Sequence, residues 1–352
     1  IIKTTLLAGL VSLSAGPAIA SDNATWQYED VFNIEYAASP QVSPSGDSIV
    51  YERRSMDIMS DSTRINLWKY NLSSNAHTPL LSGQAQYRMA RFSPDGKKLA
   101  YISNEEGDNQ LYVRWLQSGD TARVTNVEHG VSSISWSPNG QWIAFSMFKP
   151  QEAKGIFSEM PKKPKGANWA GTAKYIDQMS YRSDGRGFLP HGYRHIYIVP
   201  AEGGTPRQIT TGDFHHGGNI AWSPNGEQIF ISGDRHPDWQ DRPRESDIYQ
   251  INVATGETTN VTKREGPDAA PVMSPNGKKI AYLRFDDKKL SSQNNDIFIM
   301  NNDGSDVENL TAKLDRPIGN PKWDRKGRGL YFSYDDFGQK YVGYVNLKGK
   351  IT

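Results

Sequence analysis

Short apolar runs recur along the chain, and each of them follows a turn. In the run at 98–103 (KLAYIS), apolar side chains occupy both alternating faces. A strand with this pattern is expected to be covered above and below, because a half-exposed strand alternates apolar and polar residues. Similar runs predict strands at 48–52, 142–148, 228–232, 279–283 and 329–334. Each of these strands needs a neighbour on both of its faces.

The turn before each run has a repeated sequence. In Ser93-Pro94-Asp95-Gly96, Pro94 favours the second position of a type I turn, Asp95 suits the third, and Gly96 accepts the left-handed conformation that closes a hairpin. Four further copies have the form S-P-x-G, and a degenerate copy reads Asp-Arg-Lys-Gly. The six turns begin at residues 43, 93, 137, 223, 274 and 324.

Each turn also has the same successors along the chain. An apolar residue precedes the turn, and a second strand trails the first, at 66–72, 110–116, 195–201, 247–253, 296–302 and 341–347. A further short segment closes the first five units, at 79–83, 122–126, 207–212, 259–263 and 308–312. The chain therefore consists of a repeated unit of several strands.

The repeat predicts an all-β fold, a β-propeller of four-stranded blades. Successive turns lie about 50 residues apart except for one interval of 86 residues, and no helical pattern separates the strands. Stacked blades give every sheet two covered faces, which accounts for the continuous apolar runs. About six blades are visible, and the last is incomplete because only two strands follow its turn. A β-sandwich of similar hairpins is the alternative, and the regular spacing argues against it.

The long interval contains an insertion at 149–195, rich in Lys, Pro and Gly. This composition predicts an irregular loop, and propeller insertions normally lie on one rim. Long ordered loops are often functional, so this rim is one expected place of contact with a substrate or a second domain. An exposed loop without a role is the other interpretation.

The first 20 residues have the features of a secretory signal peptide. Lys3 precedes the apolar run at 6–13, and the small residues of Ala18-Ile19-Ala20 predict cleavage before Ser21. A frayed apolar tail is the alternative, and the run is too short to span a membrane. Export predicts a periplasmic or secreted protein. The chain has no cysteine, so its stability is expected to come from packing alone.

Charge excludes some classes of partner. Lys3 is the only charged residue of the leader, so the remaining chain has equal numbers of basic and acidic side chains. Without a net charge, no bulk field favours nucleic acid or an anionic membrane. Hydrophobic residues make up 36% and aromatic residues 11% of the chain, as in turn-rich all-β proteins.

Candidate chemistry is sparse. No G-x-S-x-G nucleophile elbow and no H-E-x-x-H motif occurs, and no glycine pattern for nucleotides follows a strand. The sequence therefore predicts no catalytic, cofactor-binding or metal-binding residue, and no cofactor. The remaining candidates have simpler interpretations: the histidines as surface or loop residues, and the acidic pairs as turns or exposed hairpins. They are His191, His195, His215, His216, Asp286-Asp287, Asp303-Gly304-Ser305-Asp306 and Glu105-Glu106.

Two long stretches carry a resemblance to a known family. Residues 28–72, which begin YEDVFNIEYAASPQVSPSGDSIVYE, and residues 181–210, YRSDGRGFLPHGYRHIYIVPAEGGTPRQIT, resemble the propeller half of the prolyl oligopeptidase family. The nearest subgroup is the exported bacterial dipeptidyl aminopeptidases and acylaminoacyl peptidases, and the similarity runs from Tyr28 to Leu347. The S-P-D-G repeats alone are less specific, because the TolB propeller shares them.

The resemblance implies a function for the chain. In that family an α/β-hydrolase domain with Ser, Asp and His follows the propeller, so residues 21–352 are expected to be a propeller whose catalytic partner domain is absent. The propeller would gate access of short peptides, and the chain alone would be inactive. Dipeptidyl-peptidase relatives hold the substrate amino terminus with propeller carboxylates, but no matching Glu pair is found here.

Two other functions remain open. One is a TolB-like periplasmic scaffold or binding propeller. TolB-like proteins place an α/β domain before the propeller, whereas only 22 residues separate Ser21 from the turn at Ser43. The other is an enzyme with its site on the propeller axis, which would require polar groups that converge on the tunnel.

Overall fold

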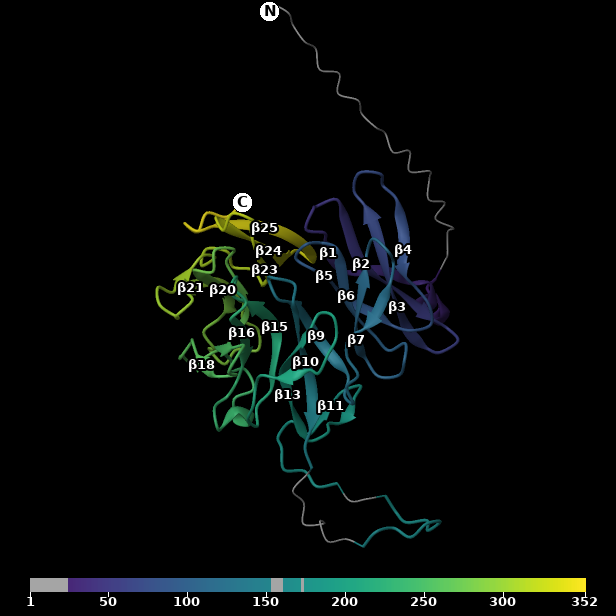
Figure 1. Ribbon diagram of the computed structural model, residues 1–352. Coiled ribbons are helices and arrows are strands. Elements are labelled where there is room, and N and C mark those ends of the chain that lie inside the picture. Colours follow the sequence, from purple (N-terminus) through teal and green to yellow (C-terminus); the bar gives the residue numbers. More distant parts are fainter. Residues whose placement is uncertain (1–24, 153–160, 172–173) are drawn as a thin grey trace, which may run out of the picture.

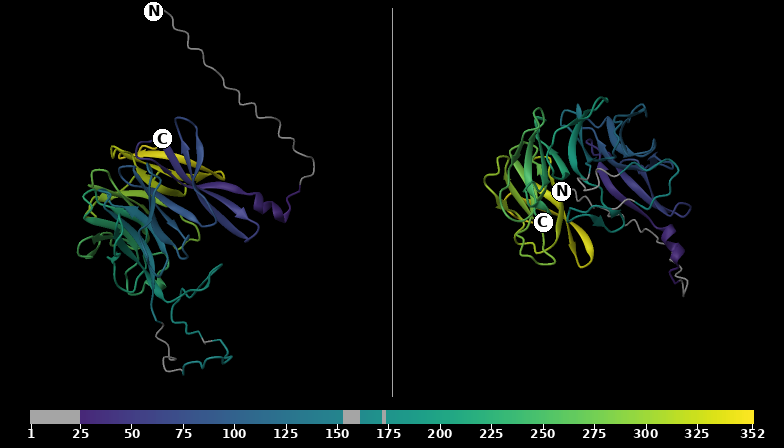
Figure 2. Two further views of the ribbon diagram at one scale, coloured as in Figure 1. Left: turned by 45° about the vertical axis from the view of Figure 1, so that its right-hand side comes forward. Right: turned by 90° about the horizontal axis from the view of Figure 1, so that it is seen from below.

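The fold is a β-propeller. A computed structural model describes residues 25–152, 161–171 and 174–352, so the predicted signal peptide lies outside the described residues. Six antiparallel sheets follow one another around a common centre (Figures 1 and 2), which confirms the predicted fold class. Among the described residues, no helix is long and apolar enough to cross a membrane.

The blades are numbered in chain order, and the 3-10 helix η1 (Tyr28–Asn33) precedes the first. Blade 1 contains β1 (Glu35–Val42), β2 (Ser48–Asp57), β3 (Ser62–Asn71) and β4 (His77–Leu81). Blade 2 contains β5 (Tyr87–Phe92), β6 (Lys98–Ser103), β7 (Gln110–Trp115) and β8 (Thr121–Arg123). Blade 3 contains β9 (Val131–Trp136), β10 (Trp142–Pro150), β13 (Gly192–Pro200) and β14 (Arg207–Gln208).

Blade 4 contains β15 (His216–Trp222), β16 (Gln228–Gly233), β17 (Asp247–Asn252) and β18 (Thr258–Asn260), with η2 (Trp239–Asp241) in its β16–β17 loop. Blade 5 contains β19 (Asp268–Met273), β20 (Lys279–Arg284), β21 (Asp296–Asn301) and β22 (Glu308–Asn309). Blade 6 contains β23 (Ile318–Trp323), β24 (Gly329–Asp336) and β25 (Gln339–Asn346). Its sheet has three strands, and the residues after β25 pair with that strand: Val345 bridges Ile351, and the backbones of Tyr344 and Thr352 exchange two hydrogen bonds. These last residues occupy the fourth-strand position of blade 6.

The insertion lies where the sequence places it. It connects β10 to β13, which pair directly as neighbours from Trp142↔Pro200 to Pro150↔Gly192. Within it, β11 (Arg182–Ser183) and β12 (Gly187–Phe188) form a separate two-stranded hairpin. Figure 1 shows the described part of the insertion extending away from the body of the propeller, on one rim.

The S-P-x-G turns have the predicted geometry. In blade 2, Ser93 Oγ accepts a hydrogen bond from the backbone N–H of Lys98 at 2.9 Å and donates one to Asp95 Oδ1 at 2.6 Å. Gly96 has a φ of 71°, the left-handed conformation that a glycine tolerates without steric cost. In blade 6, Asp324 replaces the serine, and its carboxylate accepts the backbone N–H of Arg328 instead.

The innermost strand of each blade lies before the turn, where the sequence indicates only an apolar residue. All six of these strands shift register against the second strand of their blade, as a β-bulge does. Each bulge contains a residue with positive φ: Ser39, Met89, Ser133, Gly218, Ala270 and Asn320. A bulge inserts an extra residue, so it breaks the alternation that would otherwise identify a strand.

The core is divided among the blade interfaces. Five clusters of buried apolar residues each combine side chains of two successive blades, from blades 1 and 2 through to blades 5 and 6. Leu99, Ala100, Tyr101 and Ile102 are all buried, so the expectation of strands covered on both faces is confirmed. Among the described residues, no such cluster joins blade 6 to blade 1. There, Arg325 Nη2 donates to the Pro44 carbonyl at 2.7 Å.

A buried threonine joins the third and fourth strands of four blades. In blade 4, Thr262 Oγ1 accepts the backbone N–H of Ile248 at 2.9 Å and donates to Asp247 Oδ1 at 3.0 Å. Thr125, Thr210 and Thr311 accept the corresponding backbone N–H in blades 2, 3 and 5. These threonines lie in the short closing segments of the sequence repeat. The repeated threonine of those segments therefore corresponds to a recurring hydrogen-bonding position in the blades.

Candidate functional site: the central channel

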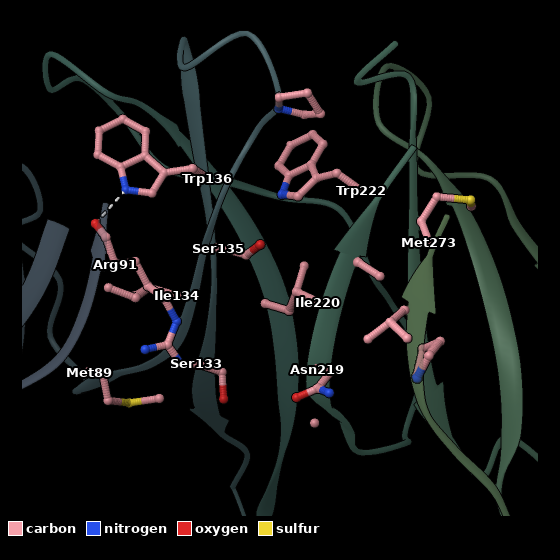
Figure 3. Close-up of a pocket in the computed structure, with 15 residues that line it drawn as sticks. Met89, Arg91, Ser133, Ile134, Ser135, Trp136, Asn219, Ile220, Trp222 and Met273 are labelled. Carbon is pink, nitrogen blue, oxygen red and sulfur yellow. Dashed lines mark hydrogen bonds between the residues drawn. The ribbon is translucent and has the colours of Figure 1, made fainter. Parts of the chain in front are cut away.

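The candidate site is a cavity on the propeller axis. It has a volume of about 460 Å³ and is lined by the inner strands β5, β9, β15 and β19 of four successive blades, with Pro138 from the turn after β9. Figure 3 shows Arg91, Ser135, Trp222 and Met273 around this space. Ligand pockets in proteins typically have volumes of about 300–1,000 Å³, so the channel has the size of a binding site.

The bulges of the inner strands form part of the channel wall. Met89, Ser133 and Gly218 are the left-handed residues of blades 2, 3 and 4, and all three line the cavity. Positive φ is costly for Met89 and Ser133, so the strands are held in this conformation by their surroundings. The backbone N–H of Met89 in blade 2 donates a hydrogen bond to Glu52 Oε1 of blade 1 at 2.8 Å. The wall is therefore a built feature of the fold.

The aromatic residue before the turn links neighbouring blades across the channel wall. Trp136 Nε1 of blade 3 donates to the Arg91 carbonyl of blade 2 at 2.9 Å (Figure 3). Trp323 Nε1 of blade 6 makes the same bond to the Val272 carbonyl of blade 5, at 3.0 Å. Trp222 is the corresponding residue of blade 4, and its buried Nε1 has no hydrogen-bond partner in the part of the chain that the structure describes.

Arg91 is the charged residue that lines the channel cavity, and no carboxylate lines it. Burial lowers the pKa of the Arg91 guanidinium, and the charge of Glu52 opposes that shift. Glu52 itself is held by Arg54, whose Nη2 lies 2.6 Å from Glu52 Oε2. Among the described residues, Arg91 has no carboxylate oxygen within ion-pair distance. The channel therefore has a positive group that the protein does not neutralise.

A second cavity, of about 700 Å³, lies on the rim formed by loops of blades 4 and 5. Its basic side chains are paired: Arg242 with Glu245 at 2.9 Å, Arg244 with Asp287 at 3.7 Å, and Lys289 with Asp287 at 2.8 Å. The Arg244 guanidinium also donates to the Leu290 carbonyl. Since these pairs satisfy the basic groups of the rim cavity, the smaller channel is the better candidate for a ligand.

Two of the four candidate histidines, His191 and His215, lie in loops as predicted, but His195 and His216 are buried in the sheets, contrary to the sequence prediction. His195 lies on β13 and His216 on β15, both are buried between blades 3 and 4, and their rings stack with centroids 5.3 Å apart. His195 Nδ1 lies 3.2 Å from Thr210 Oγ1, at the position where blade 4 has Asp247. His191 lies apart from this pair, with Nε2 3.5 Å from Asp177 Oδ1.

Burial keeps the stacked histidines neutral. It lowers the pKa of His195 to about 4, and the nearby Lys149 acts in the same direction. It lowers the pKa of His216 to about 3, reinforced by Arg235, whose Nη1 lies 2.5 Å from His216 Nε2. His216 Nδ1 lies 3.3 Å from the Arg194 carbonyl. The ring therefore donates through Nδ1 and accepts through Nε2, which is a structural role.

The acidic pairs of the sequence lie in loops and turns, as predicted. Asp303 Oδ1 accepts the backbone N–H of Ser305, and Asp287 Oδ1 accepts that of Lys289. Glu106 lies in the exposed hairpin between β6 and β7 and pairs with Arg123. In the part of the chain that the structure describes, no group of three or more His, Asp or Glu side chains is placed to hold a metal ion.

Two family models match the chain. The model of the acylaminoacyl-peptidase N-terminal β-propeller domain matches residues 166–308, and that of the dipeptidyl peptidase IV N-terminal region matches residues 43–182. The propeller is thus similar to the amino-terminal domains of acylaminoacyl peptidases and dipeptidyl peptidases. The resemblance seen in the sequence is confirmed, and the two matches together extend from the first S-P-x-G turn into blade 5.

Curated relatives agree with this assignment. Dipeptidyl-peptidase 5 of Porphyromonas gingivalis is 23% identical over 88% of this chain and 46% of its own length. The uncharacterized peptidase YuxL of Bacillus subtilis is 27% identical over 63% of this chain and 33% of its own length. The Tol-Pal system protein TolB of Francisella tularensis is 23% identical over 62% of this chain and 50% of its own length. The chain thus spans a third to a half of these relatives.

The fold also matches a solved structure. Acylaminoacyl peptidase of Pyrococcus horikoshii superimposes with a TM-score of 0.70 at 17% identity, over 93% of this chain and 47% of that one. At this level of identity the match concerns the fold. It shows that 93% of this chain has the same propeller fold as part of that structure.

Proposed function

We propose that this propeller is the substrate-admitting domain of an exported serine peptidase that cleaves short peptides. The observation that carries the proposal is the channel on the axis, bounded by the bulged inner strands of blades 2 to 5. The propeller type supports it, because both matching family models describe peptidase propellers. In this function the channel passes an extended chain and excludes a folded one.

The size and rigidity of the channel suit such a filter. A cavity of about 460 Å³ has room for a few amino-acid residues. Its wall is fixed by the hydrogen bond from Trp136 to the Arg91 carbonyl, which ties blade 3 to blade 2. A folded protein is far larger than this opening, so it would have to unfold before entry.

Catalysis in this proposal belongs to an α/β-hydrolase domain with a Ser-His-Asp triad. The chain spans 46% of dipeptidyl-peptidase 5 and 33% of YuxL, which leaves more than half of each relative for other functions. The serine would attack the peptide carbonyl with histidine as base, backbone N–H groups would stabilise the oxyanion, and water would release the acyl group. No cofactor is required for that chemistry.

A TolB-like scaffold is the second candidate. The similarity to TolB over 228 residues favours it, because TolB is named as a component of the Tol-Pal system. A scaffold would bind a protein partner on its rim or axis without turnover. The two functions differ in one measurable respect, since only the peptidase depends on passage through the channel.

Filling the channel tests the proposed filter. Ala221 lines the cavity, so Ala221→Phe narrows it, whereas Ala254→Phe adds the same side chain to an exposed turn of the same blade. In the protein expressed from its natural gene, we expect Ala221→Phe to lower kcat/KM for peptides of eight or more residues by about tenfold, a change of about 1.4 kcal/mol in the barrier. Hydrolysis of a dipeptidyl p-nitroanilide should change less than that of the long peptides.

The control and the contrary results are clear. Ala254→Phe should leave both rates unchanged. Absence of hydrolysis and of fluorophosphonate labelling in the natural gene product would contradict the peptidase and favour the scaffold. Equal rates for long peptides in wild type and Ala221→Phe would contradict the filter alone.

Export is tested separately by the mature amino terminus, which should be Ser21 in protein recovered from the periplasm or medium.

A further inference from the structure

The channel contains hydrogen-bond donors that the protein leaves unused. Arg91 Nη1 donates to the carbonyl of its neighbour Ala90 at 2.8 Å, which uses one of the five N–H donors of the guanidinium. Among the described residues, no carboxylate pairs with it. Burial of an unpaired charge is costly, so an arginine in this position is normally matched by an anion.

Trp222 supplies a second unused donor in the same cavity. The residue is 7% exposed, and no group within residues 25–152, 161–171 and 174–352 accepts a hydrogen bond from its Nε1, whereas the equivalent Trp136 and Trp323 both donate to a carbonyl of the preceding blade. Figure 3 shows the nitrogen edge of Trp222 turned toward Ser135, across the space between β15 and β9. An unsatisfied buried donor costs about 1–3 kcal/mol, which a ligand acceptor would recover.

The other side chains that line the channel indicate the polarity of the rest of the ligand. Met89, Ile134, Ile220 and Met273 present apolar side chains to the cavity, and no carboxylate lines it. A ligand that fits this lining is an acceptor at one end and apolar along its length. A negatively charged acceptor is favoured over a neutral one, since hydrogen bonds between charged groups are about twice as strong.

We propose that the channel holds a carboxylate, with Arg91 as its charge partner and Trp222 as a second donor, and that the ligand is a short apolar peptide bound by its C-terminal carboxylate. The carboxylate site stands on the contacts of the channel and does not depend on peptidase activity. The assignment to a peptide rests on the proposed function, because a small organic acid offers the same charged group.

Calorimetric titration of the chain itself tests the site without any catalytic step. The probes are N-acetyl-Leu-Leu as the free acid, the same compound as the amide, and hexanoate. We expect the acid to bind about tenfold or more tightly than the amide, since a hydrogen bond to a charged group contributes about 1.5–3 kcal/mol. Hexanoate should bind more weakly than the dipeptide acid, because it fills less of the cavity.

Three variants assign the residues. Arg91→Gln should abolish the preference for acid over amide, while Arg91→Lys should keep part of it, since lysine retains the charge without the forked geometry. Trp222→Phe should weaken binding of the acid about fivefold, as expected for one neutral hydrogen bond of about 1 kcal/mol. Arg114→Gln, on the third strand β7 of the same blade as Arg91 and outside the channel lining, is the control and should leave every affinity unchanged.

The outcomes separate the possibilities. Equal affinity for acid and amide, an acid preference that survives Arg91→Gln, or no binding of any probe at millimolar concentration would overturn the site. Hexanoate bound as tightly as the dipeptide acid would overturn the peptide as its ligand and assign the site to small organic acids. If Arg91→Gln fails to fold, the Arg91→Lys and Trp222→Phe titrations still decide. None of these results depends on whether the natural gene product is a peptidase.

Discussion

Gly277 faces Pro224 so closely that a Cβ atom on residue 277 would lie 2.9 Å from Pro224 Cδ. The glycine of each other turn after the first faces the proline of the preceding blade at ordinary contact distance, as Gly96 faces Pro44 at 3.4 Å and Gly140 faces Pro94 at 3.7 Å. Around Gly46, by contrast, no atom lies within 4 Å of the added Cβ. The turns therefore form a chain of proline–glycine contacts that begins at blade 1 and does not close on it.

This arrangement gives two glycines with the same backbone conformation and different surroundings. Gly277 and Gly46 have φ values of 70° and 77°, so alanine meets the same left-handed strain of about 1–2 kcal/mol at both sites. Gly277→Ala additionally pushes Pro224, and overpacking of that kind costs about 1–3 kcal/mol. We expect the free energy of unfolding to fall further for Gly277→Ala than for Gly46→Ala.

Urea unfolding of the two variants and the wild type measures this difference. The comparison between the variants removes the shared backbone strain. Equal losses of unfolding free energy at the two positions would show that the contact between the turns of neighbouring blades does not contribute to the difference.

The buried threonine of blade 4 allows a second prediction. Thr262→Val keeps the shape of the side chain but leaves the Ile248 N–H and the Asp247 carboxylate without their hydroxyl partner. Each unsatisfied buried group costs about 1–3 kcal/mol, so a loss of at least about 1 kcal/mol in unfolding free energy is expected. Thr259→Val on β18, three residues before Thr262, is the control, because Thr259 is exposed and should change stability by less than about 0.5 kcal/mol. If the guanidinium unfolding midpoints of both variants shift by the same amount, the hydrogen bonds of the Thr262 hydroxyl do not account for the loss of stability.

The sequence repeat reveals some strands of the blade and conceals one. Strands such as β6 are buried on both faces, so their apolar runs are visible in a single sequence. The inner strand β9 reads VSSISW, in which one face lines the channel and the bulge at Ser133 interrupts the alternation. The channel residues Arg91 and Trp222 lie on such strands, so the candidate site was not predicted. The apolar residue before each turn was the signal that could have indicated it.

The burial of the histidines could not be predicted for a related reason. His195 occupies the third-strand position that Asp247 and Asp296 occupy in blades 4 and 5, and its closing-segment threonine, Thr210, follows the common pattern. A single sequence shows this register only after the blades are aligned. It does not show that His216 of the next blade packs on the ring, because that contact depends on the angle between two sheets.

The stacked histidines predict a loss of stability in acid. Burial lowers the pKa of His195 to about 4 and of His216 to about 3, so the unfolded chain takes up these protons first, near the ordinary histidine pKa of about 6.5. The free energy of unfolding therefore falls as the pH drops from about 6.5 toward 4. Each pKa unit of difference between the folded and unfolded states contributes about 1.4 kcal/mol, so the total loss is a few kcal/mol at most. Asp268 acts in the opposite direction, because burial raises its pKa to about 6 and its protonation below that pH stabilises the fold.

A variant isolates the contribution of the histidine. His216→Gln removes one titrating group while its amide can still donate and accept a hydrogen bond. We expect the unfolding free energy of His216→Gln to fall less steeply than that of the wild type between pH 6.5 and 4. His77→Gln, at an exposed histidine on β4, is the matched control and should retain the wild-type slope. Parallel curves for wild type and His216→Gln would contradict the role of the buried ring.

The insertion of blade 3 is predicted to be dispensable for folding. In its described part, residues 151–152, 161–171 and 174–191, no residue is buried. Its contacts with the next blade include Met179 N to Gln240 Oε1 at 2.9 Å and Gln151 Nε2 to Asp213 Oδ1 at 2.9 Å, both exposed. Because β10 and β13 already pair up to Pro150↔Gly192, an Asn-Gly turn in place of residues 151–191 should close the hairpin.

The expected result is a folded propeller whose unfolding free energy is not lower than that of the wild type by more than about 1 kcal/mol, since shortening the loop lowers its closure cost by about 0.6 kcal/mol for each halving of its length. Phe145→Ala on β10 provides the scale, because Phe145 is fully buried and stacks on Tyr197 with ring centroids 5.5 Å apart. Removing such a side chain costs about 3–5 kcal/mol. If the deletion destabilises the protein as much as Phe145→Ala does, the insertion is part of the folding unit. If it does not, any loss of activity in the deletion variant of the natural gene product would come from contacts made on the rim.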